Sequence, residues 1–156
     1  MRAFLFALGF AACALSLAPG ARGADMGRPH SIQMEEAWAR RAPMMPVMGQ
    51  MHAGTGNGAV YVTLRNTAPE TDTLVSASSD VAESVEIHET IRDGDVMRMR
   101  PVAKLEIPAG GTLTMKPGGQ HIMLINLKRE LRPGDAVRLM LTFERAAPVL
   151  LDAPVR

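Results

Sequence analysis

The sequence predicts an all-β fold, either a sandwich or a barrel of short strands. Runs of apolar and β-branched residues of strand length alternate with turn signals rich in Gly, Pro, Asn and Asp. No long segment has the period of an amphipathic helix. The chain has 156 residues, of which 47% are hydrophobic, and this is enough for one domain with one packed core.

The N-terminal segment is predicted to be an export signal that is separate from this fold. Arg2 precedes an apolar run that ends at Leu17, and small residues follow up to Gly23. We therefore expect a signal peptide over residues 1–23, cleaved after Gly23 or close to it, and a flexible leader over residues 24–30. A retained membrane anchor is the alternative, and the run is short compared with the ~20 residues of a membrane span.

The single cysteine, Cys13, lies inside the predicted signal peptide. It is too early in the apolar run for a lipoprotein cysteine, because apolar residues still follow it. After cleavage the mature chain would have no cysteine. Disulfides, cysteine nucleophiles and a thiolate ligand for metal would all be absent.

The predicted domain covers residues 31–145. Its first segment, residues 31–40, fits either a strand or a short helix, and the pattern leaves both open. A loop at residues 41–58 follows and is rich in Pro, Gly and Met. Beyond it, turn signals alternate with eight runs of strand length: 59–65, 73–77, 85–90, 96–100, 104–107, 112–115, 121–127 and 137–143.

Turn residues define how these runs connect. Asp93-Gly94-Asp95 is typical of a tight hairpin between residues 85–90 and 96–100. The tail at residues 146–156 contains Pro148 and Pro154 around a short apolar stretch, and we expect it to be loose.

Composition excludes some functions and points to another. The formal net charge is +1 and aromatics are 4% of residues, so neither a basic surface nor a stacking platform for nucleic acid is indicated. Twelve methionines are a high number for this length. Methionine fills gaps in cores, and its thioether is also a soft metal ligand, so composition alone leaves both interpretations open.

Histidines and methionines are spaced so that they can meet on one face of a sheet. A lone strand histidine is more often structural than a ligand. However, His121 and Met123 are two residues apart on a predicted strand and point to the same side. The predicted hairpin turn brings the strand with Met97 and Met99 back beside the strand with His88. His88 and Met99 are therefore expected to be neighbours across the hairpin, while His121 and Met123 approach from a third strand.

Two imidazoles and two thioethers form a ligand set with a clear preference. Soft, neutral thioethers select Cu(I) over magnesium or calcium, and zinc prefers thiolate, imidazole or carboxylate. Four neutral ligands leave a site of charge +1, which costs less to bury than a dication. Such ligands also release copper readily to a thiolate-rich acceptor.

The motif His88-x10-Met99-x21-His121-x-Met123 resembles that of the periplasmic PCu(A)C copper chaperones. The flanking segments agree, among them VEIHET at 85–90, DGDVMRMRP at 93–101, LEIPAGG at 105–111 and KPGGQHIML at 116–124. The resemblance implies a cupredoxin-like antiparallel β-sandwich with Greek-key connections. It implies one Cu(I) held by the four motif residues in the periplasm and delivered towards the binuclear copper centre of cytochrome c oxidase. The implied partners are the copper subunit of that oxidase or Sco-type thiol proteins.

The loop at residues 41–58 departs from the family pattern in its length and methionine content. It contains four methionines within eight positions followed by a histidine: Met44, Met45, Met48, Met51 and His52. Prolines and glycines between them argue against a regular strand or helix. The methionines either pack over one end of the sandwich or form a second, weaker Cu(I) site, and both remain open.

Four other functions are alternatives. A periplasmic copper buffer or resistance protein would use the same site, without a dedicated oxidase acceptor. An enzyme such as a copper oxidase is disfavoured because methionines fill the ligand sphere and no general acid or base is evident. An electron-transfer cupredoxin needs the thiolate that the mature chain lacks. A metal-free adhesion domain would not need the spaced residues. Neither nucleic-acid binding nor stable membrane insertion of the mature chain is expected.

Overall fold

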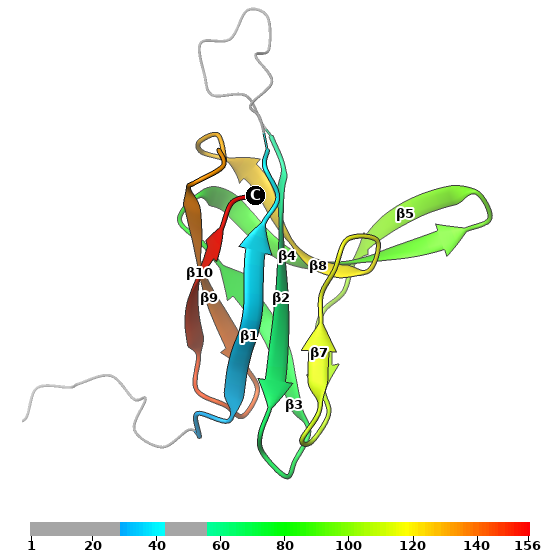
Figure 1. Cartoon of the computed structure of the whole chain (residues 1–156). Coiled ribbons are helices and arrows are strands. Elements are labelled where there is room, and N and C mark those ends of the chain that lie inside the picture. The colour runs from blue at the N-terminus through cyan, green and yellow to red at the C-terminus, as the bar shows by residue number, and fades with distance from the viewer. Residues whose placement is uncertain (1–28, 43–55) are drawn as a thin grey trace, which may run out of the picture.

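Two antiparallel sheets pack face to face in the computed structural model, which describes residues 29–42 and 56–156 (Figure 1). Ten strands form over these residues and no helix is present among them, so the predicted all-β sandwich is confirmed. The predicted signal peptide and most of the leader lie outside the described residues, as do the four methionines and His52 of the loop. No helix of the described part is long and apolar enough to cross a membrane.

The first sheet carries the segments of the predicted site. Its order is β1 (Ile32–Ala39), β2 (Gly58–Asn66), β8 (Gln120–Leu127), β4 (Ala82–Asp93) and β5 (Val96–Pro101), and the short β7 (Thr112–Thr114) also pairs with β2. Residues 31–40, left open between helix and strand, thus form a strand. β8 lies between β2 and β4, which are far from it in sequence, so the chain passes repeatedly between the two sheets.

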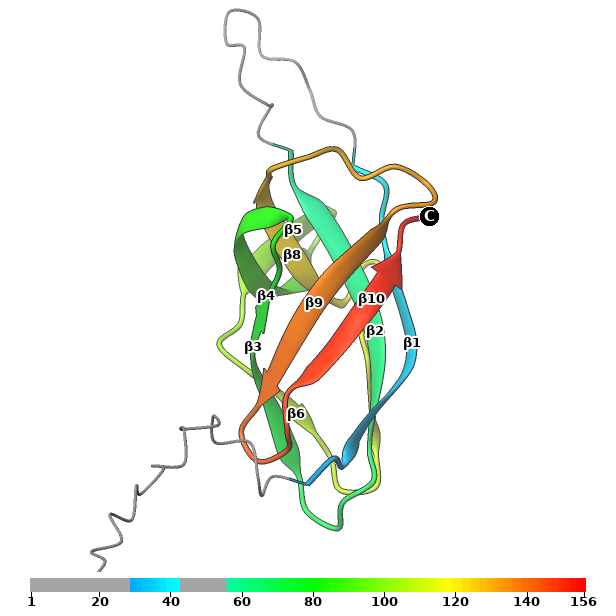
Figure 2. The same cartoon turned by 90° about the vertical axis from the view of Figure 1, so that its left-hand side faces the viewer.

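The second sheet closes the other side of the sandwich, with β9 and β10 facing the viewer in Figure 2. Its order is β10 (Val149–Pro154), β9 (Ala136–Phe143), β3 (Asp72–Ser78) and β6 (Leu105–Ile107). Side chains alternate along β9, where every second residue is buried. The core forms where the inner faces of the sheets meet, from Val60, Val62 and Leu64 of β2 and Val137, Leu139, Leu141 and Phe143 of β9, all at most 2% exposed.

The expectation of a loose C-terminal tail was wrong. Residues 149–154 form β10, which pairs with β9 along its whole length, and Leu151, Ala153 and Val155 are buried. Pro154 is tolerated at the end of the strand because β10 is an edge strand, where a missing N–H removes no ladder hydrogen bond from a neighbour.

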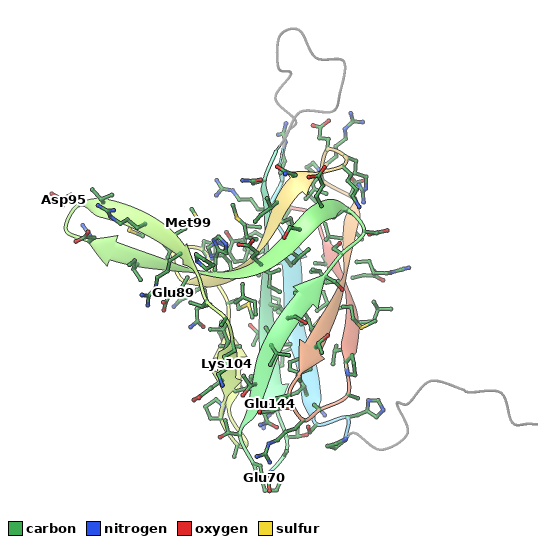
Figure 3. The ribbon with its side chains drawn as sticks, turned by 180° about the vertical axis from the view of Figure 1, so that it is seen from behind. Glu70, Glu89, Asp95, Met99, Lys104 and Glu144 are labelled. Carbon is green, nitrogen blue, oxygen red and sulfur yellow. The ribbon has the colours of Figure 1, made fainter. Side chains whose placement is uncertain are left out.

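A hairpin arm formed by β5 and the outer part of β4 projects from the sandwich (Figures 1 and 3). β4 pairs with β8 from Ala82 to Glu89, and beyond that point the strand that pairs with it is β5. All six residues of β5 are exposed. Gly94 has a φ of 62°, which permits the tight predicted turn.

Candidate metal centre

Three of the four predicted ligands lie side by side on two paired strands. In the antiparallel pair of β4 and β8, His88 is directly opposite His121, and Met123 is directly opposite Glu86. Residues opposite each other and residues two apart point to the same side of a sheet. His88, His121 and Met123 therefore share one face.

This face is the outer one of the first sheet. The intervening residues Ile87, Ile122 and Leu124 are at most 5% exposed and belong to the core. The histidines consequently point away from the sandwich interior. The site is built on a rigid sheet without interrupting the core.

Met99 is brought to the same face, but not directly opposite His88. In the register of the arm, Met99 faces Thr90, and His88 faces Pro101. Since Thr90 is two residues from His88, Met99 is a diagonal neighbour, a relation that typically separates residues by ~7–8 Å. Its side chain is 62% exposed, and Figure 3 shows it on the arm. The predicted contact across the hairpin is thus diagonal.

The two imidazoles are close together and shielded from solvent. Their ring centroids are 5.9 Å apart, His121 is 4% exposed and the His88 side chain is 13% exposed. Tyr61 places its ring 6.2 Å from His121 and in turn contacts Trp38 at 4.5 Å. An aromatic surface therefore supports His121 from the β2 side.

Each imidazole has one nitrogen engaged and one without a protein partner. Nδ1 of His121 is 3.1 Å from the carbonyl oxygen of Gly119, and Nε2 of His88 is 2.9 Å from a carboxylate oxygen of Glu86. Among the described residues, Nδ1 of His88 is the one buried side-chain nitrogen or oxygen that lacks a hydrogen-bond partner. Buried polar atoms normally have partners, so this nitrogen has an unused capacity to bind a donor or a metal ion.

A cavity of about 500 Å³ opens beside these side chains. His121, Met123 and Met99 line it, together with Met97 and Tyr61. His88 stands next to this lining through its packing against His121. Three thioethers and one imidazole thus line one space, and Met97, which is two residues from Met99 on β5, is among them.

The remaining donor chemistry near the cavity does not suit a hard metal. Within the described residues, no cluster of three or more His, Cys, Asp or Glu side chains could hold a metal ion. A four-coordinate site here needs the thioethers, and thioethers favour a soft monovalent ion. The residues present therefore fit Cu(I) better than zinc or calcium.

Two arginines give the cavity a positive rim. Arg40 and Arg41 line it. Of the arginines in the described part of the chain, only these two form no ion pair with a carboxylate, since the other nine are each paired. Their positive charge is not compensated by a carboxylate of the described residues, so it repels cations at long range and attracts an anionic ligand or partner surface.

Sequence reasoning did not single out Glu86, Gly119 or Arg41. Glu86 could have been found, because it is two residues before His88 on a strand and must share its face. The Gly119 carbonyl and Arg41 gave no such signal, since their contribution depends on how turns fold back over the sheet.

Comparison with known proteins identifies the family of this chain. The LpqE-like lipoprotein family, which covers PCuAC-like proteins, matches residues 32–155. The chain belongs to the LpqE-like family. A protein of Leifsonia xyli subsp. xyli named as a lipoprotein is 31% identical over 96% of this chain and 83% of its own length. An uncharacterized protein of Rickettsia prowazekii is 35% identical over 80% of this chain and 66% of its own length.

Solved structures similar to this LpqE-like chain confirm the cupredoxin-like sandwich. The copper-bound PCuAC domain from PmoF2 is similar with a TM-score of 0.59 and 27% identity, over 81% of this chain and 92% of that one. The Cu(I) form of DR1885 from Deinococcus radiodurans is similar with a TM-score of 0.53 and 30% identity, over 88% and 86% of the two chains.

Proposed function

We propose that this protein binds one Cu(I) ion through His88, Met99, His121 and Met123 and passes it to an acceptor protein in the periplasm. The observation that carries the proposal is the register of β4 and β8. It sets two shielded imidazoles opposite each other and places Met123 on the same face beside a cavity lined by thioethers. The similar solved structures named as copper-bound support the same metal for this chain.

The ligand set suits transfer more than storage. Four neutral donors bind Cu(I) without a thiolate, so an acceptor with thiolates would bind it more tightly. Met99 is on an exposed arm, where an incoming ligand can reach the metal from solvent. We expect no catalysis at this site, because thioethers fill the positions that a substrate would need.

Export and destination belong to the same proposal. The N-terminal pattern of a signal peptide and the lipoprotein names of relatives support an exported protein. The acceptor would be the copper subunit of cytochrome c oxidase or a Sco-type thiol protein. A copper buffer without a dedicated acceptor is the alternative that uses the same residues.

Anaerobic copper transfer tests the proposal. The Cu(I)-loaded protein is mixed with a Sco-type thiol protein, the two are separated, and copper is measured in each. Movement of copper to the thiol protein at a rate above that of free Cu(I) release supports a chaperone. Retention of copper points to a buffer, and failure to load with copper at all refutes both.

A further inference from the structure

Glu86 is placed to control which nitrogen of His88 is available to a metal. The two residues share the outer face of β4, and a carboxylate oxygen of Glu86 is 2.9 Å from Nε2 of His88. Glu86 is also directly opposite Met123 in the β4–β8 register. Its carboxylate therefore stands at the edge of the ligand set and contacts one ligand.

The hydrogen bond defines a tautomer. An ionised carboxylate can only accept hydrogen bonds, so Nε2 of His88 must carry the proton that is shared with Glu86. In the neutral imidazole the lone pair is then on Nδ1. This is the buried nitrogen that has no partner in the described part of the protein. Leaving such an atom unpaired costs free energy, and a bound metal ion would remove that cost.

The other histidine has the opposite arrangement. The carbonyl oxygen of Gly119 is 3.1 Å from Nδ1 of His121. A carbonyl also only accepts, so in His121 the proton is on Nδ1 and the lone pair is on Nε2. A backbone carbonyl thus determines the tautomer of His121, and a carboxylate side chain determines the tautomer of His88.

We propose that Glu86 is a positioning residue that holds His88 in the Nε2–H tautomer, so that His88 binds copper through Nδ1 whereas His121 binds through Nε2. This assignment rests on the proposed function for its metal. Carboxylates commonly orient metal-binding histidines in this way, and losing such a partner typically lowers metal affinity about 10–100-fold.

The carboxylate also balances charge. Cu(I) with four neutral ligands has a net charge of +1, and Glu86 supplies one negative charge a single hydrogen bond away from the ligand set. Arg40 and Arg41 are on the cavity rim and contribute positive charge without carboxylate partners among the described residues. Glu86 therefore places a negative charge in direct contact with one of the proposed ligands.

Nitrogen NMR tests the tautomers directly in the metal-free protein. Long-range proton–nitrogen spectra of the full chain with ¹⁵N-labelled histidine, at a pH near 7.5, report which ring nitrogen carries hydrogen. We expect His88 protonated at Nε2 and His121 protonated at Nδ1. Cu(I) is diamagnetic, so the same spectra recorded anaerobically with added Cu(I) should show the large shifts at Nδ1 of His88 and Nε2 of His121.

Two substitutions separate positioning from a general structural role. Glu86→Gln keeps a carbonyl acceptor and should retain the tautomer and most of the Cu(I) affinity. Glu86→Ala removes the acceptor and should give mixed tautomers at His88 and a Cu(I) affinity about 10–100-fold lower. Glu89→Ala is the matched control, because Glu89 is on the same strand but pairs with Arg100, and it should leave both readouts unchanged.

The outcomes distinguish this inference from the function on which it rests. A metal-free His88 protonated at Nδ1, or an unchanged tautomer and affinity in Glu86→Ala, overturns the role of Glu86 even if copper binds. A copper-induced shift at Nε2 of His88 overturns the assigned ligand atom. If Cu(I) leaves both imidazoles unchanged, the proposed function fails and the coordination assignment fails with it.

Discussion

At the scale of single residues, sulfur at two positions is the chemistry on which the proposed site depends. The double substitution Met99→Leu and Met123→Leu removes both thioethers while nearly conserving side-chain volume. We expect Cu(I) affinity, measured by competition with a chelator, to fall at least 10-fold because two of four ligands are lost.

The fold provides a control for that substitution. Met140→Leu changes an exposed methionine on the second sheet, away from the cavity, and should leave Cu(I) affinity unaltered. The melting temperature of both variants should remain close to that of the parent protein. A double variant that binds Cu(I) as tightly as the parent contradicts the ligand assignment.

Asp72 is a residue whose role is structural. It is 3% exposed, and its carboxylate accepts hydrogen bonds from the backbone N–H groups of Thr73, Arg145 and Ala146. Asp72→Ala leaves these donors without that acceptor and should lower the free energy of unfolding by roughly 2–4 kcal/mol. Urea denaturation measures the loss. Asp72→Asn, which keeps one acceptor oxygen, should lose less, and equal losses in the two variants would argue against the hydrogen bonds as the cause.

At this scale, the two-residue period of a strand determines which side chains can be predicted to lie together. Alternation along a strand was sufficient to place His121 and Met123 on one face, and the structure brings them there. The same alternation could not show that Met99 faces Thr90, since the register of a hairpin depends on where its turn closes. The unpaired nitrogen of His88 was also out of reach, because it depends on a rotamer and a neighbour.

At the scale of elements, the arm formed by β4 and β5 depends on one turn. Gly94 has a positive φ, and no heavy atom lies within 4 Å of where a Cβ would stand, so substitution acts through backbone strain alone. Gly94→Ala should cost about 1–2 kcal/mol locally and increase amide exchange in the arm. Cu(I) affinity should fall moderately because Met99 is held less firmly.

Gly110 allows a matched comparison for the arm. It has the same φ of 62° and equally open space, but it lies in the turn between β6 and β7. Gly110→Ala should strain its own turn to a similar extent without changing Cu(I) affinity. If both variants weaken copper binding equally, the arm has no special part in it.

The turn between β8 and β9 contributes a pH-dependent term to stability. The backbone N–H of Arg132 donates to the carboxylate of Asp135 and lowers its pKa below 3.8, and the Arg129 guanidinium lowers it further. A lowered pKa in the folded state stabilises the fold above the unfolded value of 3.8, and this contribution is lost as the pH falls from there through the folded pKa.

Titration checks this turn in two ways. The carboxyl resonance of Asp135 should titrate below pH 3.8 in the folded protein. Asp135→Asn should flatten the decrease in stability between about pH 4 and lower values, because the group that takes up the proton is gone. An Asp135 pKa at or above its ordinary value would contradict the effect of the Arg132 hydrogen bond.

β10 shows where sequence reasoning about elements was misleading. Two prolines in eleven residues predict a loose tail, and the structure has a paired strand there. Proline breaks a central strand, but an edge strand accepts it at positions that donate no ladder hydrogen bond. Which strand forms the edge is a property of the whole sheet and is absent from the local pattern.

At the scale of the whole molecule, the sandwich separates stability from metal chemistry. The inner faces of both sheets form the apolar core, and the outer face of the first sheet holds the candidate ligands. The fold class followed from strand-length runs and turns because these are local signals. The site joins β8 to β4 and β5, which are adjacent in the sequence but distant from β8. Strand period and the hairpin turn predicted which residues share a face, and the family motif identified the four as one ligand set.

β1 determines how the cavity is oriented relative to anything attached to the chain. The strand begins at Ile32 and its far end leads into Arg40 and Arg41 on the cavity rim. Its eight residues span roughly 25 Å at about 3.3 Å per residue. The opposite terminus ends beside the rim, because the N–H of Arg41 donates to the carbonyl of Arg156 at 3.0 Å.

A tether attached before Ile32, whether a purification tag or a membrane anchor, therefore lies at the end of the sandwich away from the cavity. The cavity opening is then free for a docking protein. An extension beyond Arg156 starts at that mouth. We expect a C-terminal fusion to slow copper exchange with a chelator several-fold, while the same fusion placed N-terminally leaves the rate unaltered. Stopped-flow measurements on the two fusions make the comparison, and equal rates would mean that the approach to the metal lies along the arm and not across the rim.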